Sequence, residues 1–306
     1  MNLHIETPLL ASPALAAQPG QTVWLKMEAL QPPGSFKIRG MGLACQTYAR
    51  RGARRFISSS GGNAGLAVAY AGRCLAIPVL VVVPETTSER AKALIRQQGA
   101  EVRVHGPSWQ EANALAQSML GPQDAFLHPF DDPLLWQGHA SMVEEVARAG
   151  VKPDAVLLSV GGGGLLCGVV QGLRNQGWLD VPVIAVETQG ADSLAQALAA
   201  KQRIALSRIA SIASSLGARQ VCEQAFAWAS GQHPVRSVVV LDKAAVAACL
   251  GFLDEQRVLV EPACGASLAA LHEAPELFAG YKNILVIVCG GATATLAQLQ
   301  AWAAQL

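Results

Sequence analysis

Charged and aromatic residues are scarce in this chain of 306 residues, whose formal net charge at pH 7 is +1. Asp, Glu, Lys and Arg together account for 15% of the residues, and Phe, Trp and Tyr for 5%. Proteins that bind nucleic acid or an anionic membrane surface display clustered positive charge, and this sequence has neither a basic stripe nor an acidic tail. We therefore expect no nucleic acid and no membrane among its partners.

Long apolar runs are also missing, although 51% of the residues are hydrophobic. Segments such as IPVLVVVP and NILVIVCGG have the length of a strand, whereas a membrane-spanning helix needs about 20 apolar residues. Residues 65–84 are apolar for longer, but Arg73 and Pro78 interrupt them. Residues 1–20 lack a basic start and contain Glu6, which argues against a secretory signal peptide. Buried parallel strands and helices explain the hydrophobic content better.

Paired metal-binding or disulfide motifs are absent as well. The seven cysteines include no C-x-x-C pair, and the six histidines form no H-E-x-x-H motif. An odd number of scattered cysteines is typical of reduced thiols and argues against a disulfide framework or a zinc site. We expect a cytoplasmic protein.

What the sequence does contain is a regular alternation of strand-like and helix-like segments. Apolar, β-branched runs such as PVLVVVP, DAVLLSV and NILVIV are followed by segments of helical composition, and Ser108 with Glu111 has the spacing of a capping box. This alternation predicts an α/β fold with parallel sheets covered on both faces. The turn-rich segment PFDDPLLW, residues 129–136, indicates a crossing between two domains.

Four consecutive glycines, Gly161 to Gly164, stand between an apolar strand and an apolar helix. A tight turn needs one glycine, whereas a run of four exposes successive backbone N–H groups and favours phosphate binding. A nucleotide P-loop is excluded because no lysine follows. A dinucleotide fingerprint fails at its third glycine, where Leu166 stands, although Glu187 lies where a ribose-binding acid would. An NAD site is an imperfect match that these residues leave open.

The segment SSSGGNAG, residues 58–65, also joins a strand to a helix. It offers the hydroxyl of Ser60, the amide of Asn63 and free backbone donors, which together can hold a carboxylate. Serine and asparagine are also preferred helix caps, so these residues alone do not decide between a binding loop and a capped helix.

A lysine and a cysteine complete the set of candidate functional residues. Lys37 lies between Phe36 and Ile38, and an apolar pocket would lower its pKa so that the amine could attack a carbonyl; the alternative is a surface lysine. Cys289 follows a buried strand, at the edge where ligands bind in open α/β sheets, or else only fills space. An amine, a phosphate loop, a carboxylate loop and a thiol together indicate a pyridoxal-phosphate site for an amino acid.

The chain resembles the fold type II pyridoxal-phosphate enzymes, and most closely the short L-serine dehydratases, or serine ammonia-lyases. The resemblance covers essentially the whole chain and runs through KMEALQPPGSFKIRG, SSSGGNAG, PFDDPLLWQGHAS, LSVGGGGLLCGVVQGL, VIAVET, LVEPACGASLAAL and VIVCGGATATLAQL. It implies an α/β fold like that of the tryptophan synthase β subunit, with two open parallel-sheet domains and the cofactor between them. Residues 1–34 plus 134–306 would form the large domain and residues 35–133 the small one. Family members are commonly homodimers.

The resemblance also implies a role for single residues. Lys37 would hold pyridoxal phosphate as a Schiff base and act as the catalytic base, with Phe36 against the cofactor ring. Asn63 would bind the ring hydroxyl, and Cys289 would face the pyridine nitrogen. The phosphate would accept hydrogen bonds from the backbone of Gly161, Gly162, Gly163, Gly164 and Leu165.

Two further sets of residues follow from the same resemblance. The substrate carboxylate would be bound by Ser60, Gly61, Gly62 and Asn63. A monovalent cation, expected to be potassium, would be bound by Glu187, Ala191 and Ser193. Assigning Glu187 to a cation removes the main support for an NAD site.

We expect the chain to convert L-serine to pyruvate and ammonia by α,β-elimination, and L-threonine to 2-oxobutanoate. Alternatives within the family are a threonine-preferring dehydratase and an amino-acid racemase, because Ser60 holds the position where related racemases place a second acid–base residue. An alternative of a different class is an NAD- or amino-acid-binding protein without lyase activity. The intact Lys37 and the failed dinucleotide fingerprint argue against that class.

Overall fold

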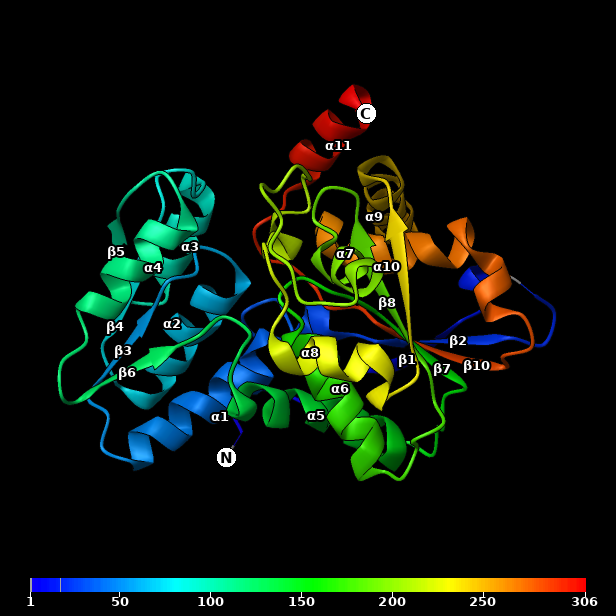
Figure 1. Ribbon diagram of the computed structural model, residues 1–306, viewed down its shortest axis with the longest axis horizontal. Coiled ribbons are helices and arrows are strands. Elements are labelled where there is room, and N and C mark those ends of the chain that lie inside the picture. Colours follow the sequence, from blue (N-terminus) through cyan, green and yellow to red (C-terminus); the bar gives the residue numbers. More distant parts are fainter. Residues whose placement is uncertain (1, 17) are drawn as a thin grey trace.

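The computed structural model describes residues 2–16 and 18–306, and in this part of the chain two β-sheets are each packed against helices (Figure 1). One sheet has six strands in the order β1-β2-β10-β7-β8-β9: β1 (Leu9–Ser12), β2 (Thr22–Lys26), β7 (Ala155–Ser159), β8 (Val183–Thr188), β9 (Val235–Val240) and β10 (Asn283–Ile287). The other has four in the order β5-β4-β3-β6: β3 (Arg55–Ser58), β4 (Val79–Val83), β5 (Glu101–Val104) and β6 (Asp124–Leu127).

The helices are α1 (Lys37–Arg50), α2 (Asn63–Leu75), α3 (Glu89–Gln97), α4 (Trp109–Ser118), α5 (Pro133–Arg148), α6 (Gly164–Asn175), α7 (Ser193–Ala200), α8 (Glu223–Ala227), α9 (Asp242–Gln256), α10 (Pro262–Glu273) and α11 (Leu296–Gln305). Most of them alternate with strands, which confirms the α/β fold expected from the sequence. No helix within residues 2–16 and 18–306 combines the length and the hydropathy needed to span a bilayer.

Neighbouring strands are parallel throughout the four-stranded sheet, and in the six-stranded sheet all but one pair are parallel. The exception is β1, which pairs antiparallel with β2 and forms one edge of the sheet. The connection between them, residues 13–21, is too short to cross over a face of the sheet as a parallel pair requires, and the regular element among its described residues is a 3-10 turn at Pro13–Leu15.

The six-stranded sheet lies in one hydrophobic core, and the four-stranded sheet lies between two, a larger one with α1 and α2 and a smaller one with α4. Every residue of β4, β7 and β8 is buried, because helices cover the sheets from both faces. All four strands of the small sheet fall within the segment 35–133 that the resemblance assigns to a small domain. The domain boundaries themselves stay a prediction.

Helices α1 and α5 connect the two sheets and lie along the lower side of the molecule in Figure 1. The turn-rich segment 129–136 is shorter than its composition indicated, because α5 already begins at Pro133. The side chain of Asp132 caps this helix by accepting a hydrogen bond from the N–H of Leu134. The two helix backbones approach closely at Gly138, where an added Cβ would lie 2.4 Å from the carbonyl oxygen of Arg39. This contact positions the start of α1, and with it Lys37.

Candidate active site

Lys37 is the first residue of α1, and its side chain is partly buried. The amine Nζ donates a hydrogen bond to the carbonyl oxygen of Pro129, at 2.7 Å, and lies 5.1 Å from the centre of the Phe36 ring. Burial lowers the pKa of Lys37 to about 8, although its electrostatic interactions with Cys289 and Glu261 act in the opposite direction. The amine is therefore far easier to deprotonate than that of an ordinary lysine.

The start of α1 is held by a buried network of opposite charges. Arg39, two residues after Lys37, is fully buried and donates to both carboxylate oxygens of Glu28 and of Glu145. Lys26 on β2 pairs with Glu145 as well. The two cations and two carboxylates are all paired, so burial leaves no charge uncompensated. The network joins α1 to α5 and β2 and fixes the direction in which Lys37 leaves the helix.

The four-glycine loop connects β7 to α6 and has no room for side chains. An added Cβ at Gly162 would lie 2.2 Å from the ring of Phe130, and one at Gly164 would lie 2.7 Å from the carbonyl oxygen of Phe130. An added Cβ at Gly161 would lie 2.9 Å from the carbonyl oxygen of Ser215, and Gly163 has a φ of +92°. Because the first N–H groups of a helix have no acceptor within it, this loop and the start of α6 form a cradle of backbone donors.

The second glycine-containing loop connects β3 to α2, whose first residue is Asn63. The hydroxyl of Ser60 accepts a hydrogen bond from the N–H of Gly62, at 3.3 Å. An added Cβ at Gly61 would lie 2.6 Å from a methyl group of Thr87, so this position is also closed to larger side chains unless Thr87 moves. The loop therefore presents a helix N-terminus with two small residues in front of it.

Asn63 joins this loop to the six-stranded sheet. Its amide nitrogen donates to a carboxylate oxygen of Glu261 at 2.7 Å, and its amide oxygen accepts from the N–H of Ala292 at 3.2 Å. Both ends of the side-chain amide are thus engaged by segments more than 190 residues away. The orientation of Asn63 depends on how the two sheets pack together.

Glu261 was not identified as a functional residue from the sequence. It precedes Pro262 at the start of α10 and is 5% exposed. Its carboxylate accepts hydrogen bonds from Asn63 and from the hydroxyl of Thr293, and burial raises its pKa. The only signal in the sequence was that this carboxylate stands inside the apolar segment LVEPACG. Charged residues are rarely buried without a partner, so a carboxylate in such a segment indicates a specific contact.

Cys289 follows β10 at the carboxyl edge of the six-stranded sheet and is 7% exposed. Its backbone carbonyl accepts a hydrogen bond from the N–H of Phe36 at 3.1 Å, which places it beside the start of α1. A hydrogen bond with the thiol of Cys264, together with burial, raises the pKa of Cys289 well above its usual range. The thiol is therefore neutral at physiological pH.

The three residues expected to bind a cation lie at the carboxyl end of the next strand, β8. Both carboxylate oxygens of Glu187 accept hydrogen bonds, at 2.8 Å each, from the N–H groups of Leu194 and Ala195 in the first turn of α7. Burial raises the pKa of Glu187 to about 8, against the effect of these bonds. The hydroxyl of Ser193 is buried without a hydrogen-bond partner, and Ala191 is also buried.

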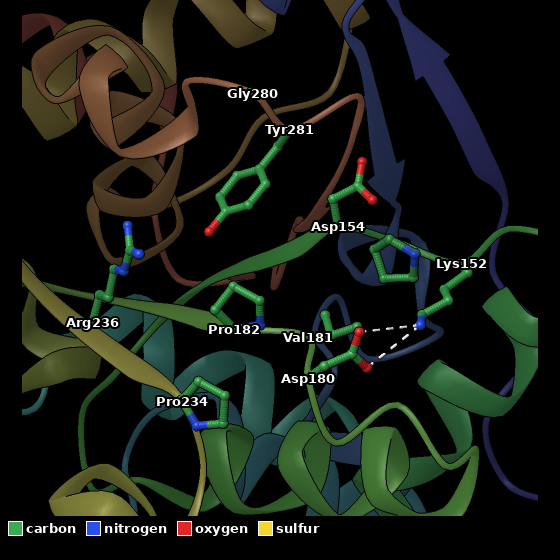
Figure 2. A pocket seen from close by; sticks show the side chains of 10 residues that line it. Lys152, Asp154, Asp180, Val181, Pro182, Pro234, Arg236, Gly280 and Tyr281 are labelled. Atoms are coloured by element: carbon green, nitrogen blue, oxygen red, sulfur yellow. Dashed lines mark hydrogen bonds and ion pairs between the residues drawn. The ribbon is translucent and has the colours of Figure 1, made fainter.

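The structure thus gathers Lys37, Asn63, Cys289 and the glycine loop around the carboxyl ends of β3, β7 and β10. A surface cavity of about 590 Å³ lies at the opposite edge of the six-stranded sheet (Figure 2). Lys152, Asp180, Arg236 and Tyr281 line it, and Figure 2 shows the pairing of Lys152 with Asp180. Open α/β sheets bind ligands at their carboxyl edge, and no site residue expected from the sequence lines this cavity, so we do not assign the active site there.

Comparisons with known proteins match nearly the whole chain. The family model described as pyridoxal-phosphate dependent enzyme matches residues 1–290. A protein of Homo sapiens named L-serine dehydratase/L-threonine deaminase is 46% identical over 99% of this chain and 96% of its own length. A Dictyostelium discoideum protein named L-serine dehydratase is 43% identical over 97% of this chain and 91% of its own length. A solved structure of a fungal L-serine ammonia-lyase from Rhizomucor miehei is 34% identical, with a TM-score of 0.93, and covers 99% of this chain and 98% of that one.

Proposed function

Because this chain belongs to the family of pyridoxal-phosphate dependent enzymes, we propose that it deaminates L-serine to pyruvate and ammonia and L-threonine to 2-oxobutanoate. The observation that carries this proposal is the position of Lys37, whose amine donates to the carbonyl oxygen of Pro129, the residue before the Phe130 that packs against Gly162. Burial lowers the pKa of this amine to about 8. The name of the human relative supports both substrates, and that of the Dictyostelium discoideum relative supports serine. The reaction is the elimination of water from the β-hydroxy amino acid, followed by loss of ammonia.

The described residues fit pyridoxal phosphate. The cradle would offer its phosphate the backbone N–H groups of residues 161–165. The four glycines in it carry no side chains, and an added Cβ at Gly162 or Gly164 would collide with Phe130. Lys37 would hold the cofactor through its amine, Asn63 would bind the ring hydroxyl, and Cys289 would face the ring nitrogen. When bound, pyridoxal phosphate supplies the electron sink that stabilises negative charge at the substrate Cα.

The chain's own contribution to proton transfer comes from Lys37. A lysine with a pKa near 8 is neutral in about one molecule in ten at pH 7, whereas a lysine with the ordinary value is neutral in fewer than one in a thousand. The amine of Lys37 can therefore accept the proton of the substrate Cα at physiological pH. The hydrogen bond to the carbonyl oxygen of Pro129 holds the amine in one direction before it reacts.

The substrate carboxylate would lie at the start of α2, on the loop formed by Ser60, Gly61, Gly62 and Asn63. The N-terminus of a helix carries a partial positive charge and free N–H donors, which favour an anion there. Glu261 accepts one N–H of Asn63 and so limits the directions in which the amide can donate to a ligand. The neutral thiol of Cys289 provides no negative charge opposite the cofactor ring.

A monovalent cation, with potassium as the first candidate, would be bound by Glu187, Ala191 and Ser193. The buried and unpartnered hydroxyl of Ser193 supports this part of the proposal, because such oxygens are rarely left unsatisfied.

The proposal further includes a cytoplasmic homodimer. Seven free cysteines, six of them buried, support a reducing compartment.

The deciding experiment is to incubate the purified protein, loaded with pyridoxal phosphate in potassium buffer, with L-serine and then with L-threonine. We expect keto acid and ammonia in equal amounts from both, and no activity in Lys37→Ala. Lys243→Ala, which changes an exposed lysine on α9, is the matched control and should match the wild type. Borohydride reduction followed by peptide mass spectrometry should place the cofactor on Lys37. If neither amino acid yields keto acid, the proposed function is wrong.

A further inference from the structure

Two cysteines lie directly behind the glycine loop. Cys167 is on the first turns of α6, and Cys222 immediately precedes α8. Their sulfur atoms are 3.7 Å apart, and each residue is 1% exposed. A disulfide has a sulfur–sulfur distance of about 2.05 Å, so less than 2 Å of movement separates the pair from a covalent bond.

Both cysteines are also tied to the loop through the backbone. The N–H of Cys167 donates to the carbonyl oxygen of Gly163 at 2.9 Å, and the N–H of Cys222 donates to that of Gly162 at 3.0 Å. No free space separates the loop from α8, since an added Cβ at Gly163 would lie 2.4 Å from the Cβ of Ala225 and 3.3 Å from the sulfur of Cys222. A movement of either sulfur must therefore be transmitted to the glycines.

We propose that Cys167 and Cys222 are an oxidation site, at which a peroxide forms a disulfide that displaces the glycine loop and weakens the binding of a phosphate-bearing ligand. The formation of the bond depends on the two thiols and the oxidant, and not on the proposed function. Its effect on the ligand rests on the proposed function, in which this loop binds the cofactor phosphate.

The chemistry balances with hydrogen peroxide as the oxidant. The Cys222 thiolate attacks one peroxide oxygen, the O–O bond breaks, and a sulfenic acid and hydroxide form. The thiol of Cys167 then attacks the sulfenic sulfur, its proton leaves with the hydroxyl group as water, and the disulfide closes. Two thiols are oxidised, and one peroxide is reduced to two molecules of water once the hydroxide takes up the proton lost by Cys222.

Cys222 is suited to be the attacking group, because the hydrogen bond from the Cys167 thiol stabilises its thiolate and lowers the pKa of Cys222. A cavity of about 230 Å³ lies on the Cys167 side of the pair. Cys222 does not line it, so an oxidant of the size of water would approach the Cys222 sulfur past that of Cys167, 3.7 Å away. Cys167 forms part of the lining of the cavity, together with Trp136, Gln171, Arg174, Gln224 and Trp228. A water molecule occupies roughly 30 Å³ in the liquid, so the cavity holds a peroxide easily.

The test uses the cofactor-loaded enzyme with Cys74→Ser, because Cys74 is exposed and would otherwise react on its own. After peroxide treatment and denaturation, we expect the count of free thiols to fall from six to four. Trypsin digestion without reductant should yield one linked species containing residues 149–174 and 220–236, which carry Cys167 and Cys222. The apparent dissociation constant of pyridoxal phosphate should rise about tenfold or more, and dithiothreitol should restore it.

Two further variants of the Cys74→Ser enzyme distinguish an effect of the Cys167–Cys222 pair from an effect of other thiols. Each variant is compared with its own untreated form. Cys222→Ser should keep all five remaining thiols and show no peroxide-dependent loss of cofactor. Cys45→Ala removes a buried thiol from the core of the small sheet and should respond like the parent. A linkage between Cys264 and Cys289, or no linkage at all, would overturn the proposal. A linked Cys167–Cys222 pair with unchanged cofactor affinity would overturn its second half, whereas failure of the untreated enzyme to make keto acid concerns the proposed function alone.

Discussion

We expect the charged Lys37 side chain to lower the free energy of unfolding, and the size of this effect follows from its pKa. Burial moves the pKa of Lys37 from 10.5 in an unfolded chain to about 8 in the folded protein. At pH 7 the side chain is charged in both states, and keeping it charged when buried costs about 3 kcal/mol. Methionine has a similar length and no charge. Lys37→Met should therefore stabilise the cofactor-free protein, less about 1 kcal/mol for the hydrogen bond that Pro129 loses.

The net gain of about 2 kcal/mol in the free energy of unfolding of Lys37→Met over the wild type should become smaller as pH rises above 8. Between pH 8 and 10.5 the unfolded chain holds the lysine proton more firmly than the folded chain, so the wild type becomes more stable as pH rises, while Lys37→Met does not. By pH 9.5 the free energy of unfolding of the wild type should have risen by about 2 kcal/mol, and the two proteins should then be about equally stable. Below pH 8 the difference should be constant.

Urea denaturation of both proteins, stripped of cofactor and measured between pH 7 and pH 9.5, gives this difference directly. Lys243→Met on the exposed side of α9 is the control, and its effect should be small and the same at every pH. Other groups that titrate in this range cancel when each variant is compared with the wild type. If Lys37→Met is no more stable at pH 7, or if its advantage does not shrink above pH 8, then Lys37 is not buried with a lowered pKa and the argument for its role as a base fails.

Three further predictions concern the rest of the site. Gly162→Ala places a methyl group against the ring of Phe130, so we expect cofactor affinity to fall about tenfold or more, and an unchanged absorbance titration would contradict the cradle. Glu261→Ala leaves an amide N–H of Asn63 unpaired and should lower kcat about tenfold at equal cofactor loading, while Glu261→Gln, which can still accept that hydrogen bond, should recover most of the rate. Replacing potassium by a bulky organic cation should lower the activity of the wild type but not that of Glu187→Gln, and equal wild-type rates in both salts would argue against a cation site.

Several local features of this chain were determined by its sequence, because they depend on residues a few positions apart. The capping box at Ser108 forms as expected, with the Glu111 carboxylate accepting from the N–H of Ser108. The strand–glycine–helix order around Gly161–Gly164 and the position of Cys289 after a buried strand were also correct. Steric limits on the backbone act locally, and a short run of apolar, β-branched residues bounded by turn signals is enough to predict a buried strand. The motifs also predicted the family, which the comparisons confirm.

Tertiary packing alone decided which of these local features act on one another. The contacts between Asn63 and Glu261, between Lys37 and Pro129, and between Cys167 and Cys222 join residues 198, 92 and 55 positions apart. No periodicity along a chain encodes such distances, because they arise when sheets and helices bury their apolar faces against each other. The pKa of Lys37 also depends on tertiary packing. Its neighbours in sequence suggested an apolar setting, but only burial among segments distant in sequence, which include Pro129 and Cys289, removes the water that would otherwise keep the amine charged.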